Sequence, residues 1–250
     1  MEEYYTNVSK RLQVYRNLLD LTQKQMGEKF GVGQSHYCKL EAGLKNVSYD
    51  NLRCFEQHGG DIYYLITGQR VKSGKMETYL SRCRTHQGRK QLFQFLIPIT
   101  QMGLALILEQ DIQLTERTFK SARFIKEYDI RLTTWENIRK AESCSQLKMA
   151  EIFDVNIKRY RNIEKEKTKP NAEILHTLYH KLKYSPLLVL DQKMYYVDEM
   201  NRAWDLFPED ISEELGTIIE TILKFVQAHE EQEGKGSRQS ENCENNSQTG

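Results

Sequence analysis

The chain is poor in the features that build crosslinked or membrane-embedded proteins. Its five cysteines are odd in number and widely scattered, which excludes a disulfide framework and suits a reducing compartment. The most apolar stretch, 92–108, is interrupted by Gln94, Pro98, Thr100 and Gln101, so it falls short of the roughly 20 apolar residues of a membrane span. The first residues contain no signal-peptide core, and we expect a cytoplasmic protein.

Signatures of catalysis and metal binding are equally scarce. The sequence contains no phosphate-cradling glycine loop and no nucleophile–base motif. His176 and His180 lie four residues apart on one expected helix, but no third metal ligand is evident nearby, and Cys83 and His86 are isolated. We therefore expect a protein that is not an enzyme and has no cofactor and no metal site.

Charge of one sign is also lacking, because the formal net charge is only +1. The distribution is nevertheless uneven. Residues 156–169 hold six basic and two acidic side chains, a local balance of +4, while 33–46 have a balance of +1 and 205–233 are strongly acidic. The near-neutral total hides a basic segment and an acidic one.

An ungapped internal repeat is the most informative feature that is present. The 250 residues contain only four prolines, and heptad-like apolar spacing favours an all-α protein. At a constant offset of 123 residues, similar residues recur: Thr22 and Ser145, Gln23 and Gln146, Met26 and Met149, Phe30 and Phe153, Tyr37 and Tyr160, Leu40 and Ile163, Glu41 and Glu164, Leu52 and Leu175. One structural unit is therefore used twice.

The first copy is predicted to contain five helices. Its first helix carries an apolar stripe at helical spacing, made of Val8, Leu12, Tyr15, Leu18 and Leu19. The others follow good N-cap residues or glycine stops, over 23–30, 34–42, 49–57 and 62–67.

The second copy is predicted to have the same plan. Its first helix spans 130–142, with Trp135 and Ile138 as core candidates, and Ser145, Asn156 and Asn171 cap the next three. Asp154 stands at a turn that favours the left-handed conformation, which Asp tolerates. Glu166 replaces a glycine, so the end of the third helix is expected to differ.

Both copies resemble a known DNA-binding family. TQKQMGEKFGVGQSHYCKLEAG and SQLKMAEIFDVNIKRYRNIEKEKTKPN resemble the helix-turn-helix of phage-repressor or XRE regulators, and DIYYLITG resembles the closing helix of that domain. The resemblance implies two five-helix, lambda-repressor-like domains. It also implies that an arginine of the first helix pairs with a glutamate of the third, here Arg16 with Glu41 and Arg139 with Glu164, both 25 residues apart.

The third helix of each copy is the expected reader of the DNA major groove. Gln23 and Gln146, at the start of the second helices, are expected to contact phosphate and to brace the third helices. Base-reading candidates on the third helices are Gln34, Ser35, His36 and Lys39 in the first copy and Ile157, Lys158, Arg161 and Asn162 in the second. Expected phosphate contacts are Lys45, Arg159, Lys165, Lys167 and Lys169. Because the two sets differ, the copies are expected to prefer different half-sites.

The predicted organisation has five parts: DNA-binding domains at 1–68 and 130–192, a helical connection at 69–129, a C-terminal helical segment at 193–233 and a disordered tail at 234–250. An amphipathic helix is expected over 212–230. A homodimer through 92–108 or 212–230 is possible, and an internal core or a ligand pocket at 92–108 stays open.

The expected function is sequence-specific, double-stranded DNA binding by a transcription regulator, acting as a repressor. The alternative is an adaptor or antitoxin in which one copy binds DNA and the other binds a protein or peptide partner. The operator, the regulated genes and any effector are not readable from the sequence.

Overall fold

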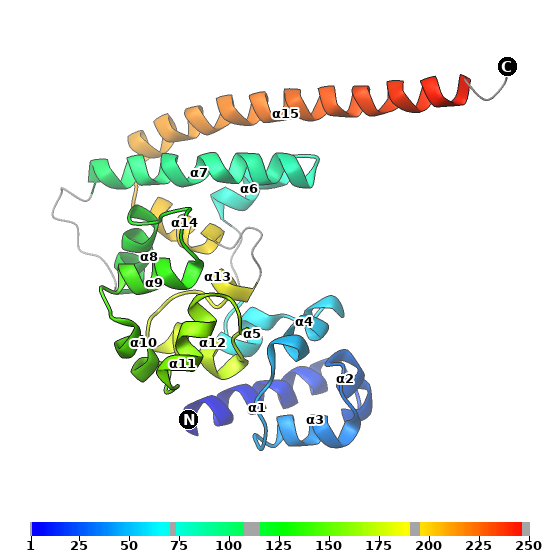
Figure 1. Ribbon diagram of the computed structural model, residues 1–250, viewed down its shortest axis with the longest axis vertical. Coiled ribbons are helices and arrows are strands. Elements are labelled where there is room, and N and C mark those ends of the chain that lie inside the picture. Colours follow the sequence, from blue (N-terminus) through cyan, green and yellow to red (C-terminus); the bar gives the residue numbers. More distant parts are fainter. Residues whose placement is uncertain (1, 71–73, 108–115, 191–195, 247–250) are drawn as a thin grey trace. The chain divides into compact units, whose positions relative to one another are not determined.

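The computed structural model describes residues 2–70, 74–107, 116–190 and 196–246, and all regular secondary structure in these ranges is α-helical (Figure 1). The chain divides into two compact units, each built from two separate segments. Unit 1 contains 1–72 and 127–195, and unit 2 contains 73–126 and 196–250. Both copies of the repeat therefore lie in unit 1. The borders of the units fall close to the predicted boundaries at 68, 129 and 192. The sequence did not predict that 1–72 and 127–195 would form one unit and 73–126 and 196–250 the other.

Unit 1 holds ten helices in its described residues, five from each copy. The first copy supplies α1 (Glu2–Leu18), α2 (Gln23–Lys29), α3 (Gln34–Glu41), α4 (Tyr49–Gln57) and α5 (Ile62–Thr67). The second copy supplies α9 (Thr134–Ala141), α10 (Gln146–Ile152), α11 (Ile157–Glu164), α12 (Ala172–His180) and α13 (Leu187–Leu190). The bounds of α2, α3 and α4 coincide with those of α10, α11 and α12 at the offset of 123 residues.

The matching bounds follow from matching caps. Thr22 accepts a hydrogen bond from the backbone N–H of Gln25, and Ser145 accepts one from that of Lys148. Ser48 and Asn171 cap α4 and α12 in the same way. A side-chain oxygen at this position satisfies an N–H group that the helix leaves without an internal partner. The starts of these four helices are therefore encoded locally, whereas α3 follows Gly33, which has no side chain to cap it.

The turns between helices also repeat. Positive φ angles occur at three equivalent pairs, Asp20 and Ser143, Gly31 and Asp154, and Gly43 and Glu166. The expectation that Glu166 changes the end of the third helix is wrong. Its backbone takes φ +56° against +72° at Gly43, and its N–H bonds Ile163 at 2.8 Å where that of Gly43 bonds Leu40 at 3.1 Å. Packing of the surrounding helices thus holds a glutamate in a conformation that favours glycine.

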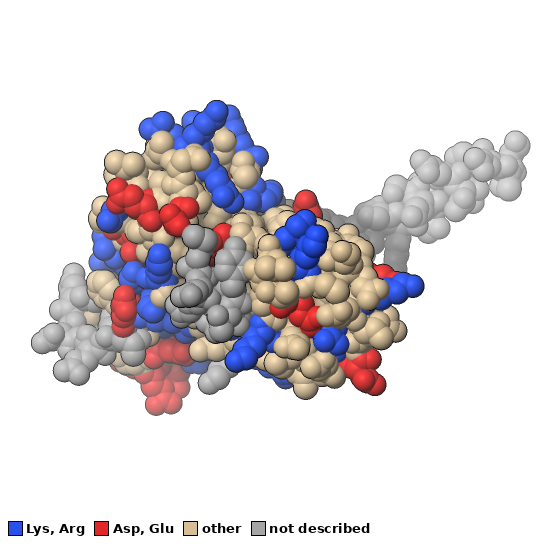
Figure 2. Space-filling view, turned by 90° about the horizontal axis from the view of Figure 1, so that it is seen from below, with Lys and Arg blue, Asp and Glu red and all other residues tan. Residues whose placement is uncertain are grey.

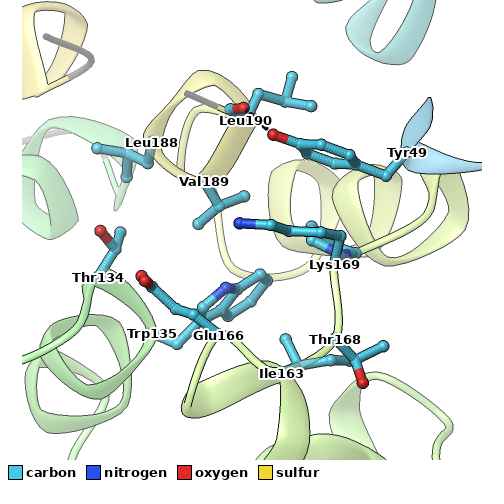
Figure 3. Close-up of a pocket in the computed structure, with 11 residues that line it drawn as sticks. Tyr49, Thr134, Trp135, Ile163, Glu166, Thr168, Lys169, Leu188, Val189 and Leu190 are labelled. Carbon is cyan, nitrogen blue, oxygen red and sulfur yellow. Dashed lines mark hydrogen bonds between the residues drawn. The ribbon is translucent and has the colours of Figure 1, made fainter. Parts of the chain in front are cut away.

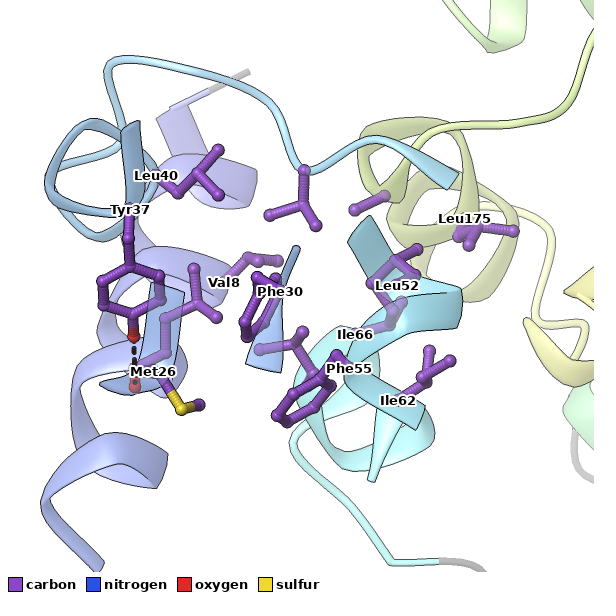
Figure 4. Close-up of a cluster of buried hydrophobic side chains, with 14 of the residues drawn as sticks. Val8, Met26, Phe30, Tyr37, Leu40, Leu52, Phe55, Ile62, Ile66 and Leu175 are labelled. Carbon is purple, nitrogen blue, oxygen red and sulfur yellow. Dashed lines mark hydrogen bonds between the residues drawn. The ribbon is translucent and has the colours of Figure 1, made fainter. Parts of the chain in front are cut away.

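The core of the first copy extends into the second (Figure 4). Phe30, Phe55 and their apolar neighbours form one buried cluster with Ala172, Leu175 and Leu190. The backbone N–H of Ala172 also donates to the carbonyl of Val47 at 3.0 Å. The two copies are consequently joined by shared burial and backbone hydrogen bonding.

Polar bonds surround this shared core. The Tyr49 hydroxyl donates to the Leu190 carbonyl at 2.6 Å, and the Asn46 amide donates to Glu173 at 2.9 Å. The Tyr179 hydroxyl donates to Gln69 at 2.8 Å. These contacts connect the loop before α4, the first residue of α4 and the chain after α5 to α12 and α13. Unit 1 is therefore a single packed body.

Two details of the predicted helices are corrected. Leu18 and Leu19 are exposed, because α1 ends at Leu18 and the chain turns at Asp20 beyond the core. The first helix of the second copy begins at Thr134, and Ile130 is exposed. Thr133 caps α9, and Asn137 donates its amide to the carbonyl of Asp129, so local hydrogen bonds hold the preceding residues in a turn.

Unit 2 is built from α6 (Lys75–Ser81), α7 (His86–Ile107), α8 (Glu116–Lys126), α14 (Tyr196–Trp204) and α15 (Glu209–Asn246). The predicted helix at 212–230 is part of α15, which continues across 234–246, where the sequence predicts disorder. Two glycines, two serines and three asparagines make that stretch a poor helix former, so its helix is the continuation of one already nucleated by packing rather than a product of local propensity.

The left-handed glutamate offers a test of the repeat geometry. We expect Glu166→Gly to raise the free energy of unfolding of unit 1 by about 1 kcal/mol, because glycine reaches a positive φ without a steric penalty. The reverse change in the other copy, Gly43→Glu, should lower it by about the same amount. Urea unfolding followed by Trp135 fluorescence in a Trp204→Phe background measures both, since these are the only tryptophans. Unchanged unfolding midpoints for both variants would contradict a left-handed backbone conformation at Gly43 and Glu166.

Candidate nucleic-acid interface

A buried carboxylate holds the C-terminal end of each third helix. Glu41 accepts hydrogen bonds from Arg16 Nε at 2.9 Å and from Gln23 Nε2 at 2.6 Å. Glu164 accepts the equivalent bonds from Arg139 Nε at 2.5 Å and from Gln146 Nε2. One carboxylate thus ties the first, second and third helices of its copy together. We call this arrangement the carboxylate brace.

The braces are shielded from water. The Glu41 side chain is 7% exposed and the Glu164 side chain only 1%. Burial, reinforced by the neighbouring carboxylate, raises the pKa of the Tyr37 and Tyr160 hydroxyls far above the ordinary value. The hydrogen bond from Arg139 to Glu164 raises the pKa of that guanidinium. Both copies therefore have a similar buried electrostatic environment around the brace.

The glutamines also contact the middle of the third helices. Gln23 Oε1 accepts from the Cys38 thiol at 3.0 Å, and Gln146 Oε1 accepts from Arg161 Nε at 3.1 Å. Cys38 and Arg161 are equivalent in the repeat. The sequence prediction missed Cys38, although the fixed offset could have revealed it. Gln23 and Gln146 each bridge two points of a third helix.

The outer side of α3 is polar and reaches solvent. Gln34, Ser35 and Lys39 are exposed, and His36 is half-buried. Lys45 is exposed in the loop that follows. The opposite side of α3 is apolar, with Tyr37 and Leu40 in the core. The structure therefore brings the predicted residues of the first copy to one surface.

The outer side of α11 is more basic. Lys158, Arg159 and Arg161 are exposed, while Ile157 and Asn162 are half-buried beside them. Asn156 caps the helix by accepting from the Arg159 backbone N–H at 2.8 Å. The N-terminal turn of α11 is thus capped, and its cationic side chains are exposed to solvent.

Three further cations follow α11. Lys165, Lys167 and Lys169 are exposed in the loop that leads to α12. Lys169 lies over the ring of Tyr49, 5.7 Å from its centroid, and so contacts the first copy as well. Figure 2 shows the side on which α3 and α11 lie in Figure 1, and Lys and Arg groups occur over both halves of this face. The second copy has the higher density of positive charge.

A small pocket lies between the copies within unit 1 (Figure 3). Tyr49 lines it from the first copy, and Trp135, Glu166, Lys169 and Val189 line it from the second. Tyr49 and Lys169 both line it, so the pocket is a product of the shared interface. It has too little space for an organic effector.

The two histidines that lie four residues apart in the sequence are both on α12. The rings of His176 and His180 are tilted by 34°, with their centroids 4.1 Å apart. Burial, followed by the neighbouring His180 and Arg11, lowers the pKa of His176 to about 3, so this ring is neutral near pH 7. Across the described ranges, no three His, Cys, Asp or Glu side chains are grouped to hold a metal ion.

No helix within the described residues combines the length and the apolar character needed to cross a bilayer.

The carboxylate brace of the second copy can be tested by a change of one atom. Glu164→Gln keeps the shape of the side chain but removes the nearest counter-charge of Arg139, so we expect unit 1 to lose about 2–4 kcal/mol of stability. Glu151→Gln is the control, because its ion pair with Lys148 is exposed and should contribute less than about 0.5 kcal/mol. Urea unfolding measures both. Equal midpoints for the two variants would show that the brace does not stabilise the fold.

Comparison with known proteins identifies part of this architecture. A helix-turn-helix family model matches residues 12–53, which run from the middle of α1 into α4. No curated protein and no solved structure matches the chain. The matched segment contains Arg16, Gln23 and Glu41, and therefore the whole carboxylate brace of the first copy. The chain thus carries an XRE-type helix-turn-helix domain in this segment.

Proposed function

We propose that this protein is a sequence-specific, double-stranded DNA-binding transcription regulator that reads DNA with both α3 and α11. The carrying observation is that two helices with exposed polar outer sides are held by the same carboxylate brace, and that one of them lies in the matched helix-turn-helix segment. An α-helix fits the major groove, and its N-terminal side chains reach base edges.

The second copy contributes most of the affinity. Lys158 and Asn162 are placed to read bases, guanine and adenine respectively, and Ile157 to meet a thymine methyl group. Arg161 is held by Gln146, so it reaches the DNA from a fixed position. Arg159, Lys165, Lys167 and Lys169 contact phosphates, and each contact releases counterions.

The first copy reads with a different surface. Gln34 suits adenine and Lys39 suits guanine, while Ser35 and His36 add hydrogen-bonding groups beside them. Lys45 supplies a phosphate contact. Because the reading residues differ from those of α11, the two copies prefer different half-sites, and one chain recognises an asymmetric operator.

In this function the protein acts by occupying a site on the DNA. Bound over a promoter in the cytoplasm, it represses by blocking polymerase, and it performs no catalysis. The alternative function is an adaptor or antitoxin whose first copy holds a protein partner. Its support is the composition of α3, in which Lys39 is the single Lys or Arg and the neighbouring outer residues, such as Gln34 and Ser35, are uncharged.

Charge reversal on α11 tests the proposal. We expect Lys158→Glu with Arg161→Glu to weaken DNA binding at least about a hundredfold, because two cations in the major groove are replaced by carboxylates that the DNA repels. The substrate is duplex DNA selected from a random-sequence library by the unaltered protein. The matched control is Lys126→Glu with Lys224→Glu, two exposed residues of unit 2 that change the net charge equally.

The outcomes separate the two functions. Loss of DNA binding in the α11 variant alone supports DNA reading by the second copy. The alternative, in which the first copy holds a partner instead of DNA, is supported if Gln34→Ala with Lys39→Ala on α3 leaves the affinity for DNA unchanged. An equal loss in the control variant would attribute the binding to net charge rather than to α11.

The spacing of the two half-sites provides a second test. Because the copies share a core, we expect one preferred spacing in the selected operator. Inserting about 5 or about 10 base pairs between the half-sites should both reduce the affinity to that of a single half-site, since a half turn rotates one site away and a full turn moves it about 34 Å. Electrophoretic mobility shifts with the full-length protein measure this. Equal affinity at all spacings would show that the copies bind independently.

A further inference from the structure

The outer face of the α7–α15 pair in unit 2 is apolar and open. The two helices run antiparallel, because Glu230 of α15 accepts from the Thr85 N–H at the start of α7, whereas Leu215 lies against Gly103 near its end. Their inner stripes, among them Leu92, Leu96, Ile219 and Leu223, are buried. The two segments that the sequence offered as dimer surfaces therefore bury much of their apolar area against each other.

Each helix nevertheless keeps a second apolar stripe in solvent. On α7, Phe95, Met102 and Leu106 are 44%, 44% and 55% exposed, and on α15, Ile218 and Phe225 are 39% and 60% exposed. Spacings of seven and four residues place the members of each stripe on one side of their helix.

The two stripes lie on the same face of the pair. The opposite side of α7 contacts α14 and α8, through Thr100 with Trp204 and through Gln101 with the Ile125 carbonyl. The opposite side of α15 contacts the end of α6, where Arg82 pairs with Glu220. Helices α6, α8 and α14 therefore cover one face of the pair, and helical geometry puts both exposed stripes on the other.

This face carries almost no charge. From Gln91 to Ile107, α7 has no charged residue, although 28% of the chain is charged. Its exposed positions in this span are Gln94, Phe95, Pro98, Met102, Ala105 and Leu106. On α15, the exposed Glu214 lies one turn before Ile218 and places one acidic group at the end of the stripe, whereas Glu213 and Lys224 lie on other sides of the helix. A highly charged partner or DNA would find no cluster of complementary charges here.

We propose that a second copy of this chain covers this face, so that two α7–α15 pairs pack as a four-helix bundle. A two-fold contact places a surface against itself, and a neutral apolar surface meets its own copy without repulsion. Helix α7 has 22 residues and is about 33 Å long, and two helices are about 20 Å wide. The face thus offers roughly 600–700 Å² per copy, which is enough for a small specific interface.

Sedimentation velocity on the full-length protein tests the dimer. We expect the unaltered chain to sediment as a dimer between about 1 and 100 μM. Phe95→Lys with Phe225→Lys should weaken association at least about a hundredfold, because it buries like charges against each other. Phe95→Gln with Phe225→Gln should weaken it about tenfold and guards against misfolding of the lysine variant. Phe119→Lys on α8, an equally exposed aromatic, is the control and should remain dimeric.

The contrary outcomes are distinct. An unaltered protein that stays monomeric overturns the proposal, and so does a dimer that survives both double substitutions with unchanged helical content. Monomeric protein that sediments with phosphatidylcholine vesicles, and loses this in the lysine variant, would show that lipid covers the face. DNA binding is measured separately, so failure of the dimer leaves the proposed reading of DNA intact.

Discussion

A single buried carboxylate per copy determines how the candidate reading helices are held. Glu41 and Glu164 each receive hydrogen bonds from an arginine of the first helix and a glutamine of the second. A charge with this little access to water is stable only when its partners are in place, so the position of the third helix is strongly coupled to the other two. The outer side chains are then presented by a preorganised scaffold, which lowers the entropic cost of binding.

The same scaffold supports two different surfaces. The equivalent positions on α3 and α11 are occupied by Gln34 and Ile157, Ser35 and Lys158, and Lys39 and Asn162. Inward residues, left-handed turns and the caps of the second and fourth helices are retained, whereas the outward residues have diverged. This separation of fold and surface is possible because the core and the buried carboxylate contact the inner side of each helix, and the brace glutamine adds one further contact, to Cys38 or Arg161.

The shared core makes unit 1 more than two linked domains. Val47 bonds Ala172, Tyr49 bonds Leu190, and the apolar cluster of the first copy closes over α12. Relative motion of the copies would expose this cluster and break these bonds. Unit 2 is organised differently, around an antiparallel helix pair whose second face is left without a cover. The chain thus combines a rigid body that bears both candidate reading helices with a body suited to association.

The sequence by itself determined the features that depend on near neighbours. The all-helical class, the caps at Thr22, Ser145 and Asn171, and the bounds of three helices in each copy follow from side chains within three or four residues. The braces were also predictable, because a resemblance and a fixed offset pointed to their members. Only the tertiary structure decided which surfaces are buried between distant segments: the contact of Ala172 with Val47, the burial of 212–230 against 92–107, and the left-handed turn at Glu166. These depend on how preformed helices dock, and docking is set by the summed packing of residues more than a hundred positions apart, which no local pattern records.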